Sequence, residues 1–185
     1  MPDEIINIKA PLDEATVLSL RAGQRVLITG TLYTARDAAH KRIVELIKKG
    51  EPLPFDLKGQ IIYYVGPTPA KPGQVVGSAG PTTSSRMDSY METLYKMGLK
   101  GTIGKGNRSQ EVIDLIKKYK AVHLSNIGGA GALIAKTIKK CEKIAFEDLG
   151  TEAIHRMEVE DFSCIVAYDS KGNDLYKEAI KKYGR

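Results

Sequence analysis

Most of the eight prolines in this 185-residue chain fall between residues 51 and 81, among several glycines. Because proline lacks a backbone N–H and fixes φ, this stretch cannot form one long helix. Helical spacing of apolar residues precedes it over 34–49, and short apolar strands alternate with amphipathic helices after it. That alternation predicts an α/β domain with some parallel pairing. The strands near the prolines indicate added antiparallel or barrel-like structure, so we expect a mixed sheet with flanking helices.

Local end signals locate the expected elements. Thr34 with Asp37, and Ser85 with Asp88, have capping-box spacing, which predicts helices that open at Thr34 and Ser85. We expect further helices over 109–120, from the glycine-rich turn 128–131 to 140, and over 174–183, and strands over 5–8, 25–29, 60–65, 75–76, 101–106, 121–124, 143–146 and 159–168.

The length and composition fit a single domain that spans residues 1–185. Hydrophobic residues make up 42% and charged residues 27%, which is typical of a soluble globular protein. There is no apolar run long enough for a membrane span and no apolar signal core at the N-terminus, so we expect a cytoplasmic protein. Cys141 and Cys164 are too few for a disulfide framework or an iron–sulfur site, and we expect buried thiols.

The formal net charge of +6 comes largely from lysine pairs near the ends of expected helices, where cations oppose the helix dipole. These pairs are 48–49, 117–118, 139–140 and 181–182. A non-catalytic anion- or nucleic-acid-binding module is an alternative reading of the basic excess. Aromatic residues are only 6% and tryptophan is absent, which is poor material for stacking bases.

Three expected helix starts carry cations beside small polar residues, at 34–37, 82–86 and 104–109. A helix N-terminus favours anions, so a cation there suggests that an anion resolves the conflict. Arg36, Arg86 and Lys105, with the hydroxyls of Thr82 and Thr83, form an inventory suited to a dicarboxylate. For either arginine alone, a surface ion pair is the structural alternative. For the hydroxyls, the structural alternative is helix capping.

Other binding motifs are absent from the sequence. The residues around Lys105 complete neither a P-loop nor a dinucleotide fingerprint. The histidines are too far apart in sequence for paired metal ligands. We expect His123 in the core and His155 at the surface. His40 lies one helical turn after Arg36, so it either orients that arginine or touches the substrate.

The run GPTTSSRMDSY at 80–90, followed by KGNR at 105–108, resembles the C-terminal region of class I fumarate hydratases, the oxygen-sensitive iron–sulfur fumarases. The same region occurs as a separate beta subunit in two-subunit fumarases and in L(+)-tartrate dehydratases. RDAAH at 36–40, VEDF at 159–162 and DSKGND at 169–174 extend the likeness over about residues 25–176. Ser85 stands where many members of the family carry glycine.

The resemblance implies a swivelling β/β/α fold and a reversible hydration of fumarate to (S)-malate. It implies a 4Fe–4S cluster that is bound by a partner alpha subunit and not by this chain. The open iron of that cluster would act as a Lewis acid on the malate hydroxyl. The expected assembly has two alpha and two beta subunits, with a homodimer when the chain is isolated, and involves neither nucleic acid nor membrane. A tartrate dehydratase beta subunit is the alternative within the same class.

The resemblance also assigns roles to individual residues. Arg36, Arg86 and Lys105 would bind the substrate carboxylates, with Thr83 and His40 as further substrate-binding residues. Thr82 falls on the threonine suggested to abstract the proton. When that proton leaves the carbon, negative charge moves onto the neighbouring substrate carboxylate, which then has the aci-carboxylate form. Lys105 would share the catalytic role by stabilising this charge. An alcohol is a poor base at neutral pH, so Thr82 would need nearby cations. It would otherwise only position substrate or relay a proton.

Overall fold

The computed structural model describes residues 5–126 and 129–184, and Gly128 of the expected glycine-rich turn lies outside them. The strands are β1 (Ile5–Ala10), β2 (Arg25–Thr34), β3 (Ile61–Tyr63), β4 (Gly101–Gly104), β5 (Val122–Ser125), β6 (Ile138–Ala145) and β7 (Ile154–Tyr168). The helices are α1 (Glu14–Ser19), α2 (Asp37–Lys49), α3 (Met91–Lys96), α4 (Gln110–Lys118), α5 (Gly131–Thr137) and α6 (Leu175–Tyr183), with 3-10 turns η1 (Ser84–Tyr90) and η2 (Glu147–Glu152).

The sheet closes on itself. Its order is β1-β2-β3-β4-β5-β7-β6, and β2 also pairs with β7, so β2, β3, β4, β5 and β7 form a five-stranded barrel. The pairs from β2 to β5 are parallel, whereas β7 runs antiparallel to both β2 and β5. Strands β1 and β6 extend the sheet beyond the barrel. The α/β class with a mixed, barrel-like sheet and flanking helices is therefore confirmed.

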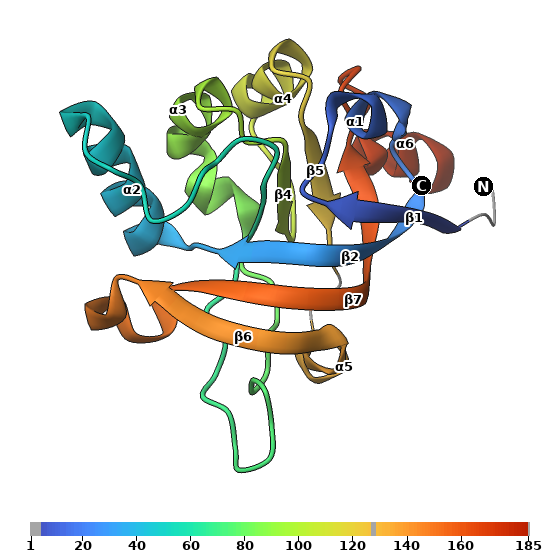
Figure 1. Ribbon diagram of the computed structural model, residues 1–185. Coiled ribbons are helices and arrows are strands. Elements are labelled where there is room, and N and C mark those ends of the chain that lie inside the picture. The colour runs from blue at the N-terminus through green and yellow to red at the C-terminus, as the bar shows by residue number, and fades with distance from the viewer. Residues whose placement is uncertain (1–4, 127–128, 185) are drawn as a thin grey trace.

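Two groups of buried side chains stabilise this arrangement. One is centred on the barrel strands and includes Ile28, Tyr63, Phe162 and Val166. The other packs the helices against the sheet and includes Ile43, Tyr64, Met87 and Ile116. Figure 1 shows α2, α3 and α4 in a row on one side of β2, with α5 and the 66–79 loop on the other side.

The parallel strands end next to one another. Thr34 of β2 is in register with Tyr63 of β3, Tyr63 with Ile103 of β4, and Gly104 with Ser125 of β5. The segments that follow these strands therefore leave from one edge of the barrel, where α/β proteins most often place ligands.

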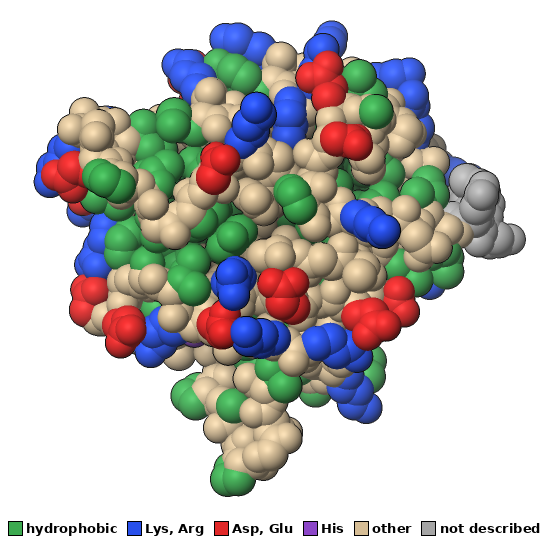
Figure 2. Space-filling view, in the orientation of Figure 1, with side chains coloured by type: hydrophobic (Ala, Val, Ile, Leu, Met, Phe, Trp, Pro, Cys, Tyr) green, Lys and Arg blue, Asp and Glu red, His purple; other side chains and the backbone are tan. Residues whose placement is uncertain are grey.

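The proline-rich loop over 66–79 projects from the body of the protein (Figure 1). Backbone bonds between Thr68 and both Gly77 and Ser78 close its base, and Val76 is buried while Val75 is exposed. The strand expected over 75–76 is therefore wrong, because the backbone bonds next to it only close the base of a loop and form no strand. In the space-filling view the projection shows no acidic side chain (Figure 2).

Several expected boundaries are corrected by tertiary contacts. Strand β2 continues through Gly30 to Thr34, whose hydroxyl bonds to the Ala153 carbonyl at 3.3 Å rather than capping α2. Helix α2 therefore begins at Asp37, later than the predicted start at Thr34. Its C-terminal end matches the prediction, because Gly50 is the C-cap and has a φ of 68°. The second capping box is also wrong: η1 begins at Ser84 and has no side-chain cap.

Strand β6 overturns a further expectation. Helix α5 stops at Thr137, so Lys139 and Lys140 lie in an edge strand rather than at a helix end. The other three lysine pairs do occupy the last turns of α2, α4 and α6. Ser109 and Asp174 cap α4 and α6, which begin close to the positions predicted for them.

Candidate functional site

Backbone hydrogen bonds bring Thr82, Thr83 and Lys105 together beyond the ends of β3 and β4. The Thr82 amide donates to the Tyr64 carbonyl at 2.7 Å, and the Lys105 amide donates to the Thr82 carbonyl at 3.1 Å. The Ser84 amide then donates to the Lys105 carbonyl at 2.8 Å, and Thr83 and Lys105 form a parallel bridge. Two segments that are separate in sequence therefore lie side by side.

An ion pair attaches Arg86 to the start of α2. Its Nε donates to Asp37 Oδ1 at 2.9 Å, and Nη2 lies 2.8 Å from Asp37 Oδ2. Arg36 immediately precedes Asp37 in the chain, so the two arginines come together at the beginning of one helix. The candidate residues from all three sequence clusters thus occupy the same edge of the barrel.

Arg36 contacts an internal carboxylate. Its Nη2 lies 3.6 Å from Glu152 Oε1, and Glu152 Oε2 accepts from the Ala38 amide at 3.0 Å in the first turn of α2. Gly66 packs so closely that a Cβ there would lie 2.9 Å from Arg36 Nη1. The anion expected at this helix start is therefore present within the protein itself.

The same holds at the other helix starts, which corrects the argument that these cations require an external anion. Asp37 pairs with Arg86, and Asp88 pairs with Arg108. Lys105 differs, because its exposed side chain has no ion pair or hydrogen bond within residues 5–126 and 129–184. Its charge is the one most readily available to a guest.

His40 is buried in the first turns of α2, close to Arg36 at the start of that helix. Its Nδ1 lies 2.8 Å from the Arg36 carbonyl oxygen, which can only accept, so Nδ1 carries the proton in the neutral ring. Burial lowers the pKa of His40 to about 4. His40 is 0% exposed, which favours the orienting role over direct contact with a substrate.

Arg108 forms a buried polar cluster below the exposed residues. Its side chain is 0% exposed, its Nε is 2.7 Å from Asp88 Oδ1, and its Nη1 donates to the Tyr64 hydroxyl at 2.9 Å. Asp88 Oδ2 also accepts from the Ser109 amide at 2.8 Å. The cluster links η1 to the end of β3 and to the start of α4.

His123 is a core residue, as predicted. Its Nδ1 lies 2.8 Å from the Thr102 hydroxyl and its Nε2 lies 3.1 Å from the Ser84 hydroxyl. Burial holds the pKa of His123 well below its usual value, so the ring is neutral. His155, predicted at the surface, is only partly exposed, because it is half-buried and bonded to Thr34 and Ala153.

Four residues of this edge were assigned no binding or catalytic role from the sequence: Asp37, Asp88, Arg108 and Glu152. The first three stand inside the RDAAH, PTTSSRMD and KGNR runs, so their positions in these motifs could have indicated a role at the site. Glu152 lies in η2, which holds no buried residue. No local pattern marks a carboxylate that reaches its partner only through folding.

The two cysteines of this chain are poorly suited to hold an iron–sulfur cluster. Cys141 is half-buried on β6 and Cys164 is buried on β7, and burial raises the pKa of both thiols, which disfavours thiolate ligands. Within residues 5–126 and 129–184 there is also no group of three or more His, Cys, Asp or Glu side chains that could hold a metal.

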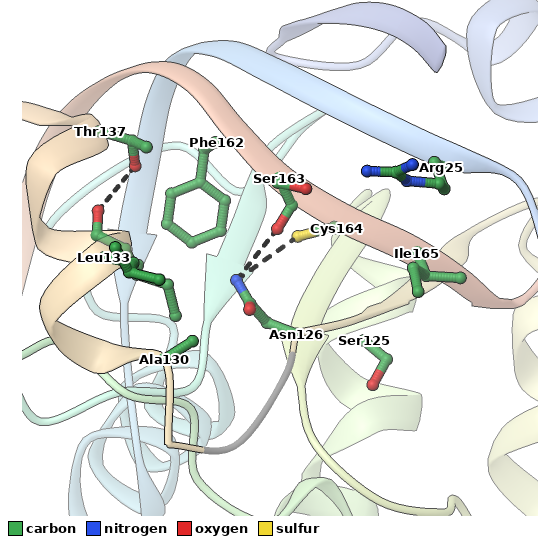
Figure 3. A pocket seen from close by; sticks show the side chains of 11 residues that line it. Arg25, Ser125, Asn126, Ala130, Leu133, Thr137, Phe162, Ser163, Cys164 and Ile165 are labelled. Carbon is green, nitrogen blue, oxygen red and sulfur yellow. Dashed lines mark hydrogen bonds between the residues drawn. The ribbon is translucent and has the colours of Figure 1, made fainter. Parts of the chain in front are cut away.

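A cavity of about 280 Å³ lies between β5, β7 and α5, and none of the six candidate residues lines it. Figure 3 shows Asn126 directed toward Ser163 and Cys164, with Phe162 and Leu133 forming an apolar part and Arg25 standing apart. Apart from the buried His40, the candidate residues lie at the surface instead, where the Arg86 side chain is 47% and the Arg36 side chain 23% exposed.

In the part of the chain that the structure describes, the helices are too short or too polar to cross a bilayer.

Comparisons with known proteins agree on one family. A family model described as the fumarase C-terminus matches residues 2–179. Fumarate hydratase 2 of Leishmania major is 42% identical over 95% of this chain, and the anaerobic class I fumarate hydratase of Escherichia coli is 40% identical over 96%. The chain spans about a third of each, 32% and 33% respectively.

A relative of similar length is also present. A protein of Methanocaldococcus jannaschii, provisionally named L(+)-tartrate dehydratase subunit beta, is 40% identical over 92% of this chain. The match covers 91% of that relative, so the region that this chain spans also exists as a separate polypeptide.

Proposed function

Because the chain belongs to the family of the fumarase C-terminus, we propose that it is the beta subunit of a two-subunit hydro-lyase that hydrates fumarate reversibly to (S)-malate. The relatives named as fumarate hydratases are about three times as long as the matched region. We therefore assign this chain the substrate-binding half of the site, formed by residues 1–185 as one domain. The rest of the site belongs to a partner alpha subunit.

One observation supports this proposal above the others. The Thr83–Lys105 bridge and the Arg86–Asp37 ion pair gather three motif segments at one edge of the barrel. The guanidinium and ammonium groups of those segments are the types of cation that bind the two carboxylates of a C4 diacid. A diacid could therefore contact Arg36, Arg86 and Lys105 at once.

In this proposal each side chain has a defined task. The free N–H groups of Arg36 and Arg86 donate to the substrate carboxylates, and the Lys105 ammonium stabilises the charge of the aci-carboxylate. Preorganised donors of this kind contribute about 2.7–4 kcal/mol each to a transition state. Thr83 adds a hydroxyl to the same surface, and His40 holds the Arg36 carbonyl in place.

Thr82 is the candidate for moving the proton. Its amide donates to the Tyr64 carbonyl and its carbonyl accepts from the Lys105 amide, so the side chain starts from a fixed backbone position next to Lys105. Cations near an alcohol lower its pKa, which is the requirement for a threonine base. Unchanged turnover of Thr82→Ala in the assembled enzyme would eliminate a chemical role for this hydroxyl.

The openness of the surface supports a partner. Solvent and salt weaken the interactions of charges that are in contact with water. The substrate-binding cations Arg36, Arg86 and Lys105 therefore need a second protein surface that excludes water from the bound diacid. We propose that a cluster-bearing alpha subunit supplies that surface and the 4Fe–4S cluster, in an assembly of two alpha and two beta subunits. The two free thiols of this chain agree with a reducing, cytoplasmic location.

Reconstitution tests the proposed function. The isolated chain should be colourless and inactive, and mixing it anaerobically with the cysteine-bearing subunit should produce malate from fumarate. The Arg86→Gln chain should assemble equally well and lose at least about a hundredfold in kcat/KM, the usual effect of removing one such donor. Full activity of Arg86→Gln, or of the partner alone, would refute this assignment.

Tartrate is the alternative substrate, favoured by the M. jannaschii relative that this chain covers almost completely. Tartrate carries one hydroxyl more than malate, and the described residues offer no side chain that we can assign to it. Parallel turnover assays of the reconstituted complex with malate and L(+)-tartrate decide between the two.

A further inference from the structure

The Arg86–Asp37 pair joins two motifs that the sequence separates by 49 positions. Both carboxylate oxygens take part, one with Nε at 2.9 Å and the other with Nη2 at 2.8 Å. The contact therefore occupies one edge of the guanidinium plane, the edge formed by Nε and Nη2.

A guanidinium has five N–H donors in a rigid plane and can bind a carboxylate on either of two edges. Asp37 accepts the Nε–H through Oδ1, and its Oδ2 forms an ion-pair contact with Nη2. Both Nη1 hydrogens and the Nη2 hydrogen that points away from Asp37 are left for another acceptor. Within the described part of the chain Arg86 contacts no acceptor besides Asp37, and its side chain is 47% exposed. The Nη1–Nη2 edge is therefore free for a second carboxylate.

We propose that Asp37 is a positioning residue for Arg86, which fixes the guanidinium plane and leaves its Nη1–Nη2 edge for a substrate carboxylate. This inference rests on the proposed function, in which Arg86 binds the diacid. Asp37 is the first residue of α2 and follows Arg36 directly. One helical turn thus fixes the backbone of one arginine and the side chain of the other.

The electrostatics point to geometry rather than attraction as the purpose of this pair. Asp37 cancels the charge of Arg86, which weakens long-range attraction for a dianion. The side chains are 47% and 33% exposed, and exposed ion pairs of this kind add little to stability. What the pair does provide is a single orientation of a long side chain, which a substrate would otherwise have to impose on binding.

A matched pair on the same helix gives the control. Arg42 of α2 binds Asp148 of η2 through both oxygens, each at 2.8 Å, and the pair is exposed like the first. Asp148→Asn therefore removes a second exposed Asp–Arg pair of α2, one that is bound through Nη1 and Nη2, while leaving Arg86 untouched. Asp37→Asn keeps the shape of the residue and removes its charge.

The first experiment uses the intact isolated chain and needs no partner. The hydrogen-exchange rate of the Arg86 Nε–H, measured by 15N NMR, should rise about threefold or more in Asp37→Asn. It should stay unchanged in Asp148→Asn. In Asp37→Asn the Arg42 Nε–H serves as the internal reference, because the Arg42–Asp148 pair is intact there. Equal Arg86 rates in the wild type and Asp37→Asn, with unchanged backbone spectra, would overturn the proposal.

The second experiment is a double-mutant cycle in the reconstituted complex, with malate as the substrate. Asp37→Asn should lower kcat/KM, have no further effect in the Arg86→Gln background, and contrast with an unaffected Asp148→Asn. Additive losses would show that Asp37 acts independently of Arg86 and would reject the positioning role. A wild-type complex without turnover would count against the proposed function alone, because the exchange measurement still reports on Asp37.

Discussion

Arg108 has no exposed side-chain surface, and its Nε lies 2.7 Å from Oδ1 of Asp88. A buried guanidinium needs such a partner, since an isolated charge in the interior is very costly. The pair is reinforced by the Tyr64 hydroxyl on one side and the Ser109 amide on the other. It supports from below the segment that carries Thr82 and Arg86.

Breaking this pair should destabilise the fold. Asp88→Asn leaves the buried Arg108 without its counter-charge, and we expect a loss of about 3–5 kcal/mol in the free energy of unfolding, measured by urea denaturation. Asp114→Asn is the control, because Asp114 is exposed on the neighbouring α4 and its one hydrogen bond within the described residues is with Gln110. A loss for Asp88→Asn no greater than for Asp114→Asn would contradict the inferred strength of the pair.

Gly104 should resist substitution for steric reasons. A Cβ at this position would lie 2.3 Å from Ser84 Oγ and 2.8 Å from Tyr64 Cδ2, so Gly104→Ala must displace the η1 segment or the β3 end. We expect a loss of about 1–3 kcal/mol in unfolding free energy. Gly80→Ala, whose nearest contact is an ordinary 3.8 Å, should change stability by less than about 0.5 kcal/mol. Equal effects of both substitutions would refute the close packing.

The buried ring of His40 predicts a pH dependence of stability. Its pKa is about 4 in the fold and near 6.5 when unfolded, so between these values only the unfolded chain is protonated. Stability is fully present above about pH 6.5 and falls as the pH drops toward 4, by about 3 kcal/mol in total. His40→Asn keeps an N–H for the Arg36 carbonyl and does not titrate. Its unfolding free energy should therefore fall less between pH 7 and pH 4, and an unchanged difference would contradict this account.

The sequence predicted those parts of the fold that depend on local signals. Helices α4 and α6 begin close to the helix starts predicted at Ser109 and Asp174, because each of these residues caps its own helix by accepting from an amide in the first turn. The two capping boxes failed for the opposite reason. Thr34 bonds instead to Ala153, and Asp88 to Arg108, both distant in sequence. Local spacing cannot distinguish a cap from a tertiary partner.

The candidate site divides in the same way. The motif likeness identified the six candidate residues, and the shared strand edge is consistent with them, but their roles stay predictions. The internal carboxylates Glu152 and Asp37 were not anticipated as partners, because ion pairing across 49 or more positions leaves no periodic trace. Barrel closure by the β2–β7 pairing has the same non-local origin.

Lys105 should separate binding from stability most cleanly. Its side chain has no partner in the described part of the chain, so Lys105→Gln should change the unfolding free energy by less than about 0.5 kcal/mol. In the reconstituted complex the same substitution should lower kcat for malate by about a hundredfold or more, since it removes a charge that stabilises the aci-carboxylate. Lys120→Gln is the control, because Lys120 is an exposed lysine paired with Glu14 away from this edge. Turnover that is equal in the two variants would remove Lys105 from the chemistry.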